Sequence, residues 1–155
     1  MNIENNLIVV LEDIYQTHNA NSVIRTCENM GVKDLYIIEN FYPFKLDEKL
    51  SHGAINHINI HRFKTTDDCM NDLKEKGFTI IATTPHKDDY DLEELPIKEK
   101  MAIVFGSEEN GLTKNCIDSS DIYMKVPMYG FTESLNISVC VALTLFNITN
   151  RMRKL

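Results

Sequence analysis

The sequence has no apolar run long enough to cross a lipid bilayer. Its most apolar stretch, residues 137–148, is interrupted by Ser138, Thr144 and Asn147, whereas a membrane-spanning helix needs about 20 apolar residues. The N-terminal stretch MNIENNLIVVLEDIY also lacks the basic start and the small-residue cleavage site of an export signal. We therefore expect a cytoplasmic protein without a membrane partner.

Paired cysteines and a metal-ligand cluster are also missing. The cysteines at positions 27, 69, 116 and 140 form no CxxC pair, so we expect small buried hydrophobic residues in a reducing compartment. His57 and His61 lie four residues apart in a predicted strand, with no carboxylate or thiol cluster nearby, and the sequence predicts no metal site. The glycosylation sequons at Asn136 and Asn147 are interpreted as chance matches, because glycosylation requires the secretory route.

An excess of positive charge is lacking too, since the formal net charge is −7. This argues against a protein that binds nucleic acid through its bulk charge, although a local basic patch is compatible with it. Candidates for such a patch, or simply for a solvated surface, are Lys45, Lys49, Arg62, Lys64 and the C-terminal RMRK. The 155 residues contain no repeat or linker, and this length is typical of one domain with a sizeable core.

Apolar runs alternate with helical periodicity along the whole chain. The predicted strands are 7–11, 35–38, 58–63, 79–83, 102–105 and 122–126, and the predicted helices are 21–30, 66–76 and about 135–153. Gly31 and Gly77 follow two of these helices, as is typical of helix ends. The alternation predicts an α/β fold with a mainly parallel sheet and helices on both of its faces.

In such folds, ligands bind beyond the carboxyl ends of the strands. The loops to examine are therefore EDIYQTHNANSVIR, TPHKDDYD, GSEENGLTK and PMYGFTESLN, each of which follows a predicted strand. In the third loop, Gly106 and Gly111 have the spacing of a P-loop, but the Lys that should follow is absent. Glu108 and Glu109 would also repel phosphate, so this loop favours a neutral or cationic ligand over a nucleoside triphosphate. A plain turn before a helix capped near Thr113 fits as well.

Two further polar positions need an explanation. Arg25 lies off the apolar stripe of helix 21–30 and near its predicted start, where a positive charge is electrostatically disfavoured. It either meets a phosphate or carboxylate partner or is a surface arginine with a packed stem. Ser134 stands where the N-cap of the last helix is expected, but one cap does not account for Asn136 and Ser138.

Three segments, in this order, resemble the motifs of the SPOUT superfamily, in particular its SpoU/TrmH-type branch of RNA ribose 2'-O-methyltransferases. The segments are HNANSVIRTCENMG with Asn19 and Arg25, VFGSEENGLT with Glu108, and VPMYGFTESLNISV. Two departures concern the first motif: the family's proline before Asn19 is missing, and Asn21 replaces a small residue. Both affect the loop expected to face RNA, and so the choice of target.

The resemblance implies a SPOUT fold with a C-terminal trefoil knot, a homodimer, and S-adenosyl-L-methionine as cofactor. It implies that residues 1–155 form a single catalytic domain without an appended RNA-binding domain, so that a partner protein could recruit the RNA. The implied activity is 2'-O-ribose methylation of RNA, with tRNA guanosine 18 favoured. Ribosomal RNA as substrate, a non-catalytic homologue that binds the cofactor or RNA, and an unrelated nucleotide-binding protein are the alternatives.

The resemblance also assigns roles to residues. Those implied to line the cofactor pocket are Thr83, Thr84, Gly106, Val126, Met128, Ser134 and Leu135. Those implied to be catalytic are Arg25, Asn19, Glu108, Ser134 and Asn136. Because a guanidinium is a very weak base, we expect Arg25 to hold the target phosphate and stabilise the developing alkoxide rather than to take the proton.

Overall fold

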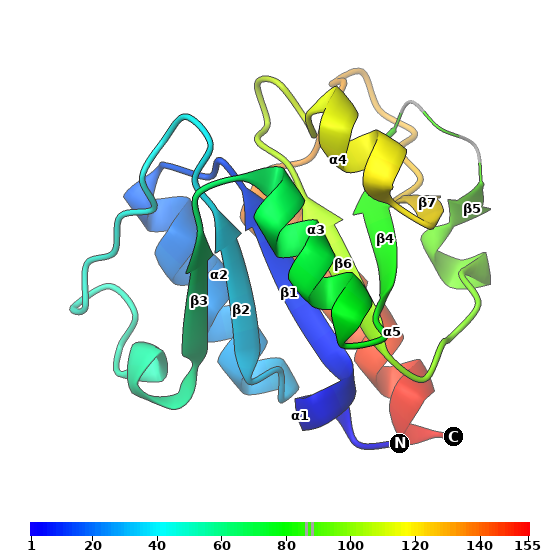
Figure 1. Cartoon of the computed structure of the whole chain (residues 1–155), viewed down its shortest axis with the longest axis horizontal. Coiled ribbons are helices and arrows are strands. Elements are labelled where there is room, and N and C mark those ends of the chain that lie inside the picture. Colours follow the sequence, from blue (N-terminus) through cyan, green and yellow to red (C-terminus); the bar gives the residue numbers. More distant parts are fainter. Residues whose placement is uncertain (86, 88) are drawn as a thin grey trace.

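Seven strands form one sheet in the order β3-β2-β1-β6-β4-β7-β5, and each pair of neighbours runs parallel. The computed structural model describes residues 1–85, 87 and 89–155. Residues 86 and 88 of the predicted loop TPHKDDYD lie outside this set. The all-parallel sheet confirms the predicted α/β class, and Figure 1 shows helices in front of it and behind it.

The boundaries of the elements are close to those predicted. The strands are β1 (Leu7–Glu12), β2 (Asp34–Ile38), β3 (Asn59–Phe63), β4 (Thr79–Thr83), β5 (Tyr90–Asp91), β6 (Met101–Phe105) and β7 (Ile122–Lys125). The helices are α1 (Ile3–Asn6), α2 (Thr17–Met30), α3 (Thr66–Glu75), α4 (Lys114–Ser119) and α5 (Ile137–Arg153), with short 3₁₀ turns η1 (Ala54–His57) and η2 (Leu92–Glu94). The two-residue strand β5 and the one-turn helix α1 were not predicted.

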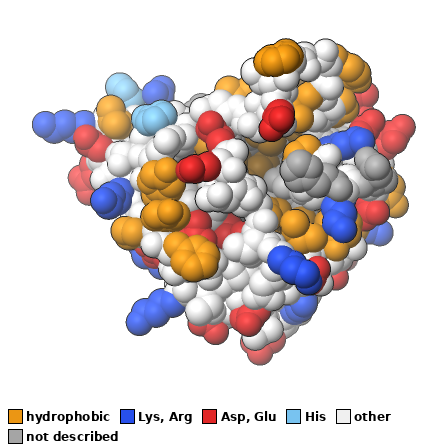
Figure 2. Space-filling view, turned by 90° about the horizontal axis from the view of Figure 1, so that it is seen from above, with side chains coloured by type: hydrophobic (Ala, Val, Ile, Leu, Met, Phe, Trp, Pro, Cys, Tyr) orange, Lys and Arg blue, Asp and Glu red, His pale blue; other side chains and the backbone are white. Residues whose placement is uncertain are grey.

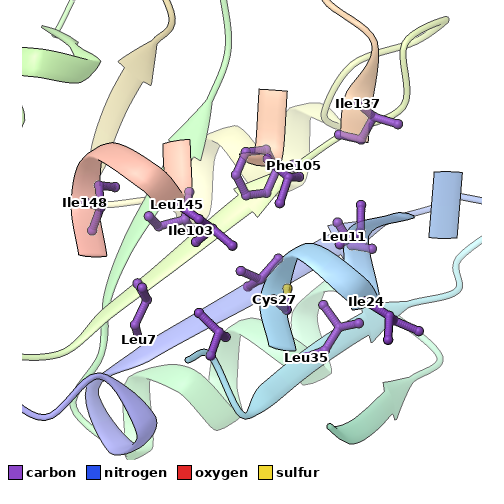
Figure 3. Packing of buried hydrophobic residues seen from close by; sticks show 14 of the residues in the cluster. Leu7, Leu11, Ile24, Cys27, Leu35, Ile103, Phe105, Ile137, Leu145 and Ile148 are labelled. Atoms are coloured by element: carbon purple, nitrogen blue, oxygen red, sulfur yellow. The ribbon is translucent and has the colours of Figure 1, made fainter. Parts of the chain in front are cut away.

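The central strands are buried on both faces, because successive side chains of a strand point to opposite sides. Leu7, Val9 and Leu11 of β1 belong to the core cluster that includes α2 and α5, whereas Ile8 and Val10 belong to the cluster that includes α3 and α4. Figure 3 shows the first cluster, in which side chains from β1, β6, α2 and α5 point toward one another. This two-sided core fixes the strand ends that carry the polar loops.

Helix α2 starts four residues earlier than predicted, at Thr17 instead of residue 21. It ends as expected at Gly31, which has the left-handed φ of 85°. Asn19 therefore lies in the first turn of the helix, and Arg25 lies in its middle. The electrostatic penalty predicted for an arginine at the positive helix end does not apply to Arg25.

Helix α5 corrects the prediction that Ser134 is its N-cap. The helix begins at Ile137, and Asn136 is the cap: its Oδ1 accepts hydrogen bonds from the backbone N–H groups of Ser138 (2.9 Å) and Val139 (3.3 Å). The Ser138 hydroxyl bonds to the same oxygen at 2.5 Å. Two of the polar residues at this helix start are thus explained by one cap.

The described histidines and cysteines belong to no cluster of three or more potential metal ligands. His57 lies in η1, not in the predicted strand, while His61 on β3 approaches Asp34 with 2.9 Å between Nε2 and Oδ1. Within residues 1–85, 87 and 89–155, no group of three or more His, Cys, Asp or Glu side chains could hold an ion. All four cysteines are free thiols, and burial raises the pKa of Cys27 to about 12 and that of Cys140 to about 11. Among the described helices none is long and apolar enough to cross a membrane.

Candidate active site at the carboxyl end of the sheet

The loops after β1, β4, β6 and β7 gather at one end of the sheet, at the top of Figure 1. Those after β4, β6 and β7 line a cavity of about 270 Å³. Every residue that the sequence assigned to the cofactor pocket lines this cavity, namely Thr83, Thr84, Gly106, Val126, Met128, Ser134 and Leu135. Parallel strands end at the same edge, which is why loops far apart in sequence meet there.

The loop after β6 is held in a tight turn by its glycines. A Cβ on Gly106 would lie 2.4 Å from the carbonyl carbon of Gly111 and 2.5 Å from the nitrogen of Leu112. Gly111 has the left-handed φ of 64°, and its N–H donates to the carbonyl of Ser107 at 2.8 Å. Only glycine fits at position 106, because any side chain there would push apart the two ends of the loop.

The far end of the same loop is fixed by a buried carboxylate. Glu12, at the end of β1, is 1% exposed. It accepts hydrogen bonds from the Thr113 N–H (2.7 Å) and hydroxyl (2.9 Å), and from the Thr66 hydroxyl (2.6 Å). Thr113 in turn caps α4, because its hydroxyl accepts from the N–H of Cys116 at 3.2 Å. The predicted capped turn is therefore present, and the loop that precedes it lines the cavity.

Glu108 joins the three motif segments. Its Oε1 accepts hydrogen bonds from Asn136 Nδ2 (3.0 Å), from the backbone N–H of Ile137 (3.0 Å) and, more weakly, from Asn19 Nδ2 (3.5 Å). Asn136 Nδ2 also donates to Asn19 Oδ1 at 3.2 Å. Asn136 thus caps α5 with its oxygen and uses its nitrogen in the site. The structure brings Asn19, Glu108 and Asn136 together, as an assembled site requires.

A second cavity, of about 350 Å³, adjoins the first. It adds the segment Asp13–Gln16 and Asn19 to the lining. The two cavities share Ser107, Glu108, Glu109, Ser134 and Ile137. Sequence reasoning missed Gln16, whose Oε1 accepts from Asn19 Nδ2 at 2.8 Å. The sequence analysis selected the polar loop after the first strand, which contains Gln16. No motif or spacing within that loop distinguished Gln16 from its neighbours.

Arg25 does not join the other predicted catalytic residues within one chain. It lines neither cavity, it is exposed, and its guanidinium forms no hydrogen bond or ion pair with any described residue. Six residues separate it from Asn19, which corresponds to about 240° of rotation around the helix. Arg25 therefore lies on the outer stripe of α2 with Ser22 and Asn29, both exposed.

The first cavity combines apolar walls with carboxylates. The apolar surface comes from Leu112, Ile117, Val126, Leu135 and Cys140. The charged lining residues are Glu108, Glu109, Glu133 and Lys125. Apolar surface suits a purine ring, while the carboxylates suit a cation such as a sulfonium or an ammonium group and disfavour a polyphosphate. S-adenosylmethionine carries a purine ring, a sulfonium and an ammonium group, and it has no polyphosphate. The residues that line the cavity therefore fit it.

Two adjoining cavities lie at the carboxyl ends of parallel strands, where ligands bind in folds of this class. The chain belongs to the SpoU rRNA Methylase family, which it matches over residues 6–146. It is a methyltransferase whose methyl donor is S-adenosylmethionine. The resemblance to SpoU/TrmH-type enzymes is thereby confirmed.

Similar proteins cover almost the whole chain. A tRNA (guanosine(18)-2'-O)-methyltransferase of Borreliella burgdorferi is 41% identical over 150 residues, which are 97% of this chain and 69% of the relative. An enzyme of the same name from Thermus thermophilus is 29% identical over 148 residues, or 96% of this chain and 76% of the relative. The crystal structure of the A. aeolicus TrmH/SpoU tRNA modifying enzyme superposes with a TM-score of 0.90 at 26% identity, covering 99% of this chain and 78% of that one.

Proposed function

We propose that this protein methylates the ribose 2'-oxygen of guanosine 18 in tRNA. One observation carries the proposal: Asn19, Glu108 and Asn136, one from each motif, are joined by hydrogen bonds, and Glu108 lines both cavities. The two relatives named for this reaction cover at least 96% of the chain and support the choice of tRNA. The family's description as rRNA methylases keeps ribosomal RNA as the second candidate.

In this proposal the first cavity holds S-adenosylmethionine. Thr83, Thr84, Gly106, Val126, Met128, Ser134 and Leu135 would line it, largely with backbone groups, since the Thr83 hydroxyl already donates to the carbonyl of Val104 at 2.7 Å. When bound, the cofactor supplies a methyl group made electrophilic by its sulfonium. The carboxylate of Glu108 faces both cavities, and its fixed hydrogen bonds orient it without side-chain reorganisation.

The remaining chemistry concerns the ribose hydroxyl, which is a poor nucleophile until it is polarised. Holding it in line with the methyl group could lower the barrier by up to about 7–11 kcal/mol, and a positioned base would add roughly 10²–10⁴-fold. Arg25 is unsuited to be that base, because its guanidinium stays protonated. We assign it to the target phosphate and the developing alkoxide, with the proton passing to phosphate or solvent.

The outward position of Arg25 is compatible with this role in a homodimer. Val139, Leu143 and Phe146 are 46%, 45% and 61% exposed and recur at helical spacing on the outer face of α5. Such an apolar stripe favours contact with a second copy. Because α5 packs beside α2, a dimer through this face would also bring the helix of Arg25 to the interface. Sedimentation of Phe146→Asp should then show monomers, whereas an unchanged sedimentation coefficient would contradict this interface.

Several finer features belong to the same proposal. Residues 1–155 would act as one catalytic domain, with the loops after β6 and β7 forming the family's C-terminal trefoil knot. The net charge of −7 means that RNA affinity must come from local basic residues, from the dimer or from a partner protein that recruits tRNA in the cytoplasm. Affinity for RNA should fall steeply with salt, as expected when several phosphates are contacted.

The direct test is methyl transfer from labelled S-adenosylmethionine to an unmodified tRNA transcript with guanosine at position 18. A transcript with 2'-deoxyguanosine there is the matched control, since it lacks only the accepting oxygen. Label in the guanosine transcript and none in the 2'-deoxyguanosine transcript would support the proposal. Transfer to ribosomal RNA alone would instead identify ribosomal RNA as the substrate. Binding of S-adenosylhomocysteine without transfer to any RNA would leave only the non-catalytic alternative.

The role of Arg25 has its own test. Lysine keeps the charge but lacks the planar fork of the guanidinium. We expect Arg25→Lys to reduce kcat by at least about tenfold while calorimetry shows unchanged affinity for S-adenosylhomocysteine. Near-normal turnover of Arg25→Lys would exclude a requirement for guanidinium geometry.

A further inference from the structure

Two tyrosine rings form an exposed pair at the second cavity. The ring centroids of Tyr15 and Tyr42 are 4.6 Å apart with an interplanar angle of 36°. Both side chains remain accessible, at 38% and 44% exposed, and Tyr15 lines the cavity directly. Figure 2, which looks onto this end of the molecule, shows hydrophobic side chains gathered near acidic ones, with basic side chains at several points around them.

A carboxylate fixes this pair. Asp13 precedes Tyr15 by two residues, is buried, and has the left-handed φ of 54°, which is unusual for a residue other than glycine. Its Oδ1 accepts from the backbone N–H groups of Phe41 (2.8 Å) and Tyr42 (3.3 Å), and its Oδ2 accepts from Asn40 Nδ2 (3.1 Å). Asp13 therefore ties the loop that carries Tyr42 to the end of β1, beside Tyr15.

The cavity in front of Tyr15 has one apolar aromatic wall and one polar wall. Its volume of about 350 Å³ falls within the range of sites for small ligands, about 300–1,000 Å³. Its polar wall contains Glu108, which also lines the cofactor cavity, and Asn19, which donates a hydrogen bond to Glu108. A nucleoside matches this division, because its ribose is polar and its base presents a flat apolar face that stacks on aromatic rings.

We propose that Tyr15 stacks on the base of the target nucleoside in the second cavity, and that Tyr42 and Asp13 are positioning residues that hold the Tyr15 ring. The ribose would then face Glu108 and the first cavity. This inference rests on the proposed function, because it requires RNA as the substrate. It adds a binding role for residues outside the three motifs and gives a function to the left-handed conformation of Asp13 after β1.

A fluorescence experiment tests the contact without requiring catalysis. The chain contains no tryptophan, so Tyr15→Trp introduces a single indole at the cavity. Titration with the unmodified tRNA transcript should quench its emission in a saturable way, because the indole stacks on the base. Tyr90→Trp is the matched control, since Tyr90 is similarly exposed (37%) but lies on β5 at the opposite edge from β3. Unquenched Tyr15→Trp in a sample that binds the transcript would overturn the inference.

Steady-state kinetics give a second, independent measurement. Tyr15→Ala should raise KM for the transcript by about tenfold or more, as expected when a base–aromatic stack is lost, whereas Tyr15→Phe should keep a KM near the original. Tyr42→Ala should raise KM less, by about threefold, with recovery in Tyr42→Phe. Affinity for S-adenosylhomocysteine should be unchanged in all four variants.

The outcomes separate the two levels of the proposal. If the unaltered protein neither binds nor methylates the transcript, the proposed function fails, and this inference fails with it. If it methylates the transcript and Tyr15→Ala has the original KM, only the stacking role is excluded. An equal KM increase in Tyr15→Ala and Tyr15→Phe would likewise exclude stacking, because phenylalanine retains the ring face.

Discussion

Glu12 ends β1 and Glu108 lies in the loop after the neighbouring strand β6, so the same side chain occurs in two different surroundings. Glu12 closes β1, is 1% exposed and accepts three hydrogen bonds from Thr66 and Thr113. Glu108 follows β6, is exposed and accepts three hydrogen bonds through Oε1 alone. Within the described ranges, which omit residues 86 and 88, neither carboxylate forms an ion pair.

From this difference we expect one type of side chain to serve structure at Glu12 and chemistry at Glu108. Both oxygens of Glu12 accept hydrogen bonds from the chain itself, and Glu12 lines neither cavity. Glu108 uses one oxygen to hold the network, and its Oε2 has no hydrogen bond among the described residues. Glu12 should therefore affect stability, and Glu108 should affect activity.

The largest effect is expected from Glu12→Ala. This change leaves the Thr113 N–H and two hydroxyls without their acceptor in a buried site, and hydrogen bonds to charged groups contribute about 1.5–3 kcal/mol each. Allowing for partial compensation by water, we expect the free energy of unfolding to fall by about 3–4 kcal/mol in urea denaturation. The exposed Glu99→Ala should stay within about 0.5 kcal/mol of the original. Equal stability of the two variants would refute the structural role of Glu12.

Glu108→Gln should produce the converse result. The amide can still accept a hydrogen bond, but the charge facing both cavities is lost. We expect kcat/KM for methyl transfer to fall by about 100-fold, which corresponds to about 2.7 kcal/mol, while the free energy of unfolding changes by less than about 1 kcal/mol. A variant that loses stability in proportion to its activity would show that Glu108 is a structural tie like Glu12.

Asn136→Asp separates the two functions of one side chain. Aspartate still caps a helix, but it cannot donate to Glu108 and places a second negative charge about 3 Å from it. We expect about a tenfold loss in kcat/KM with an unfolding free energy within about 0.5 kcal/mol of the original. Asn136→Ala should in addition lose about 1 kcal/mol of stability. Full activity of Asn136→Asp would remove the amide nitrogen from the site.

The smallest effect concerns Cys140, which lies one turn after Asn136, is partly buried and lines the first cavity. Burial raises the pKa of its thiol from 9.0 to about 11, so the folded state stays neutral where the unfolded chain ionises. The stabilisation is complete below pH 9 and is lost as the pH rises toward 11. Relative to Cys140→Ala, the protein should lose about 0.8 kcal/mol more stability between pH 8 and pH 9.5. If the free energy of unfolding of the unaltered protein and of Cys140→Ala in urea changed equally with pH, the Cys140 thiol would titrate as it does in the unfolded chain.

The sequence predicted those parts of the molecule that depend on local pattern. Apolar runs marked the central strands, because a strand covered on both faces is apolar throughout. The lining of the first cavity was predicted through family motifs, which lie in contiguous loops such as the one from Gly106 to Gly111. Local pattern suffices there because each loop follows its strand directly.

Features that depend on distant partners were not predictable. Glu12 is bound by Thr66 and Thr113, which are 54 and 101 residues away. The first turn of α2, with the polar sequence THNA, has no side-chain cap and was interpreted as a loop; it is helical where Asn19 is buried against the rest of the protein. Asn136 rather than Ser134 caps α5, and Asn136 also meets Glu108, 28 residues earlier. In each case tertiary contacts outweigh local propensity.

The place of β6 between β1 and β4 has a consequence for the nascent protein on the ribosome. β1 can pair with β2 soon after both emerge, but its other edge stays open until Met101–Phe105 has been made. At about 5–20 residues per second, the intervening 88 residues, from 13 to 100, take roughly 4–18 seconds. During this interval an unpaired strand edge is exposed to wrong partners, and a chain released early cannot bind its methyl donor. The first cavity is lined as far along the chain as Cys140, so this pocket is complete only after the first turn of α5 has been made.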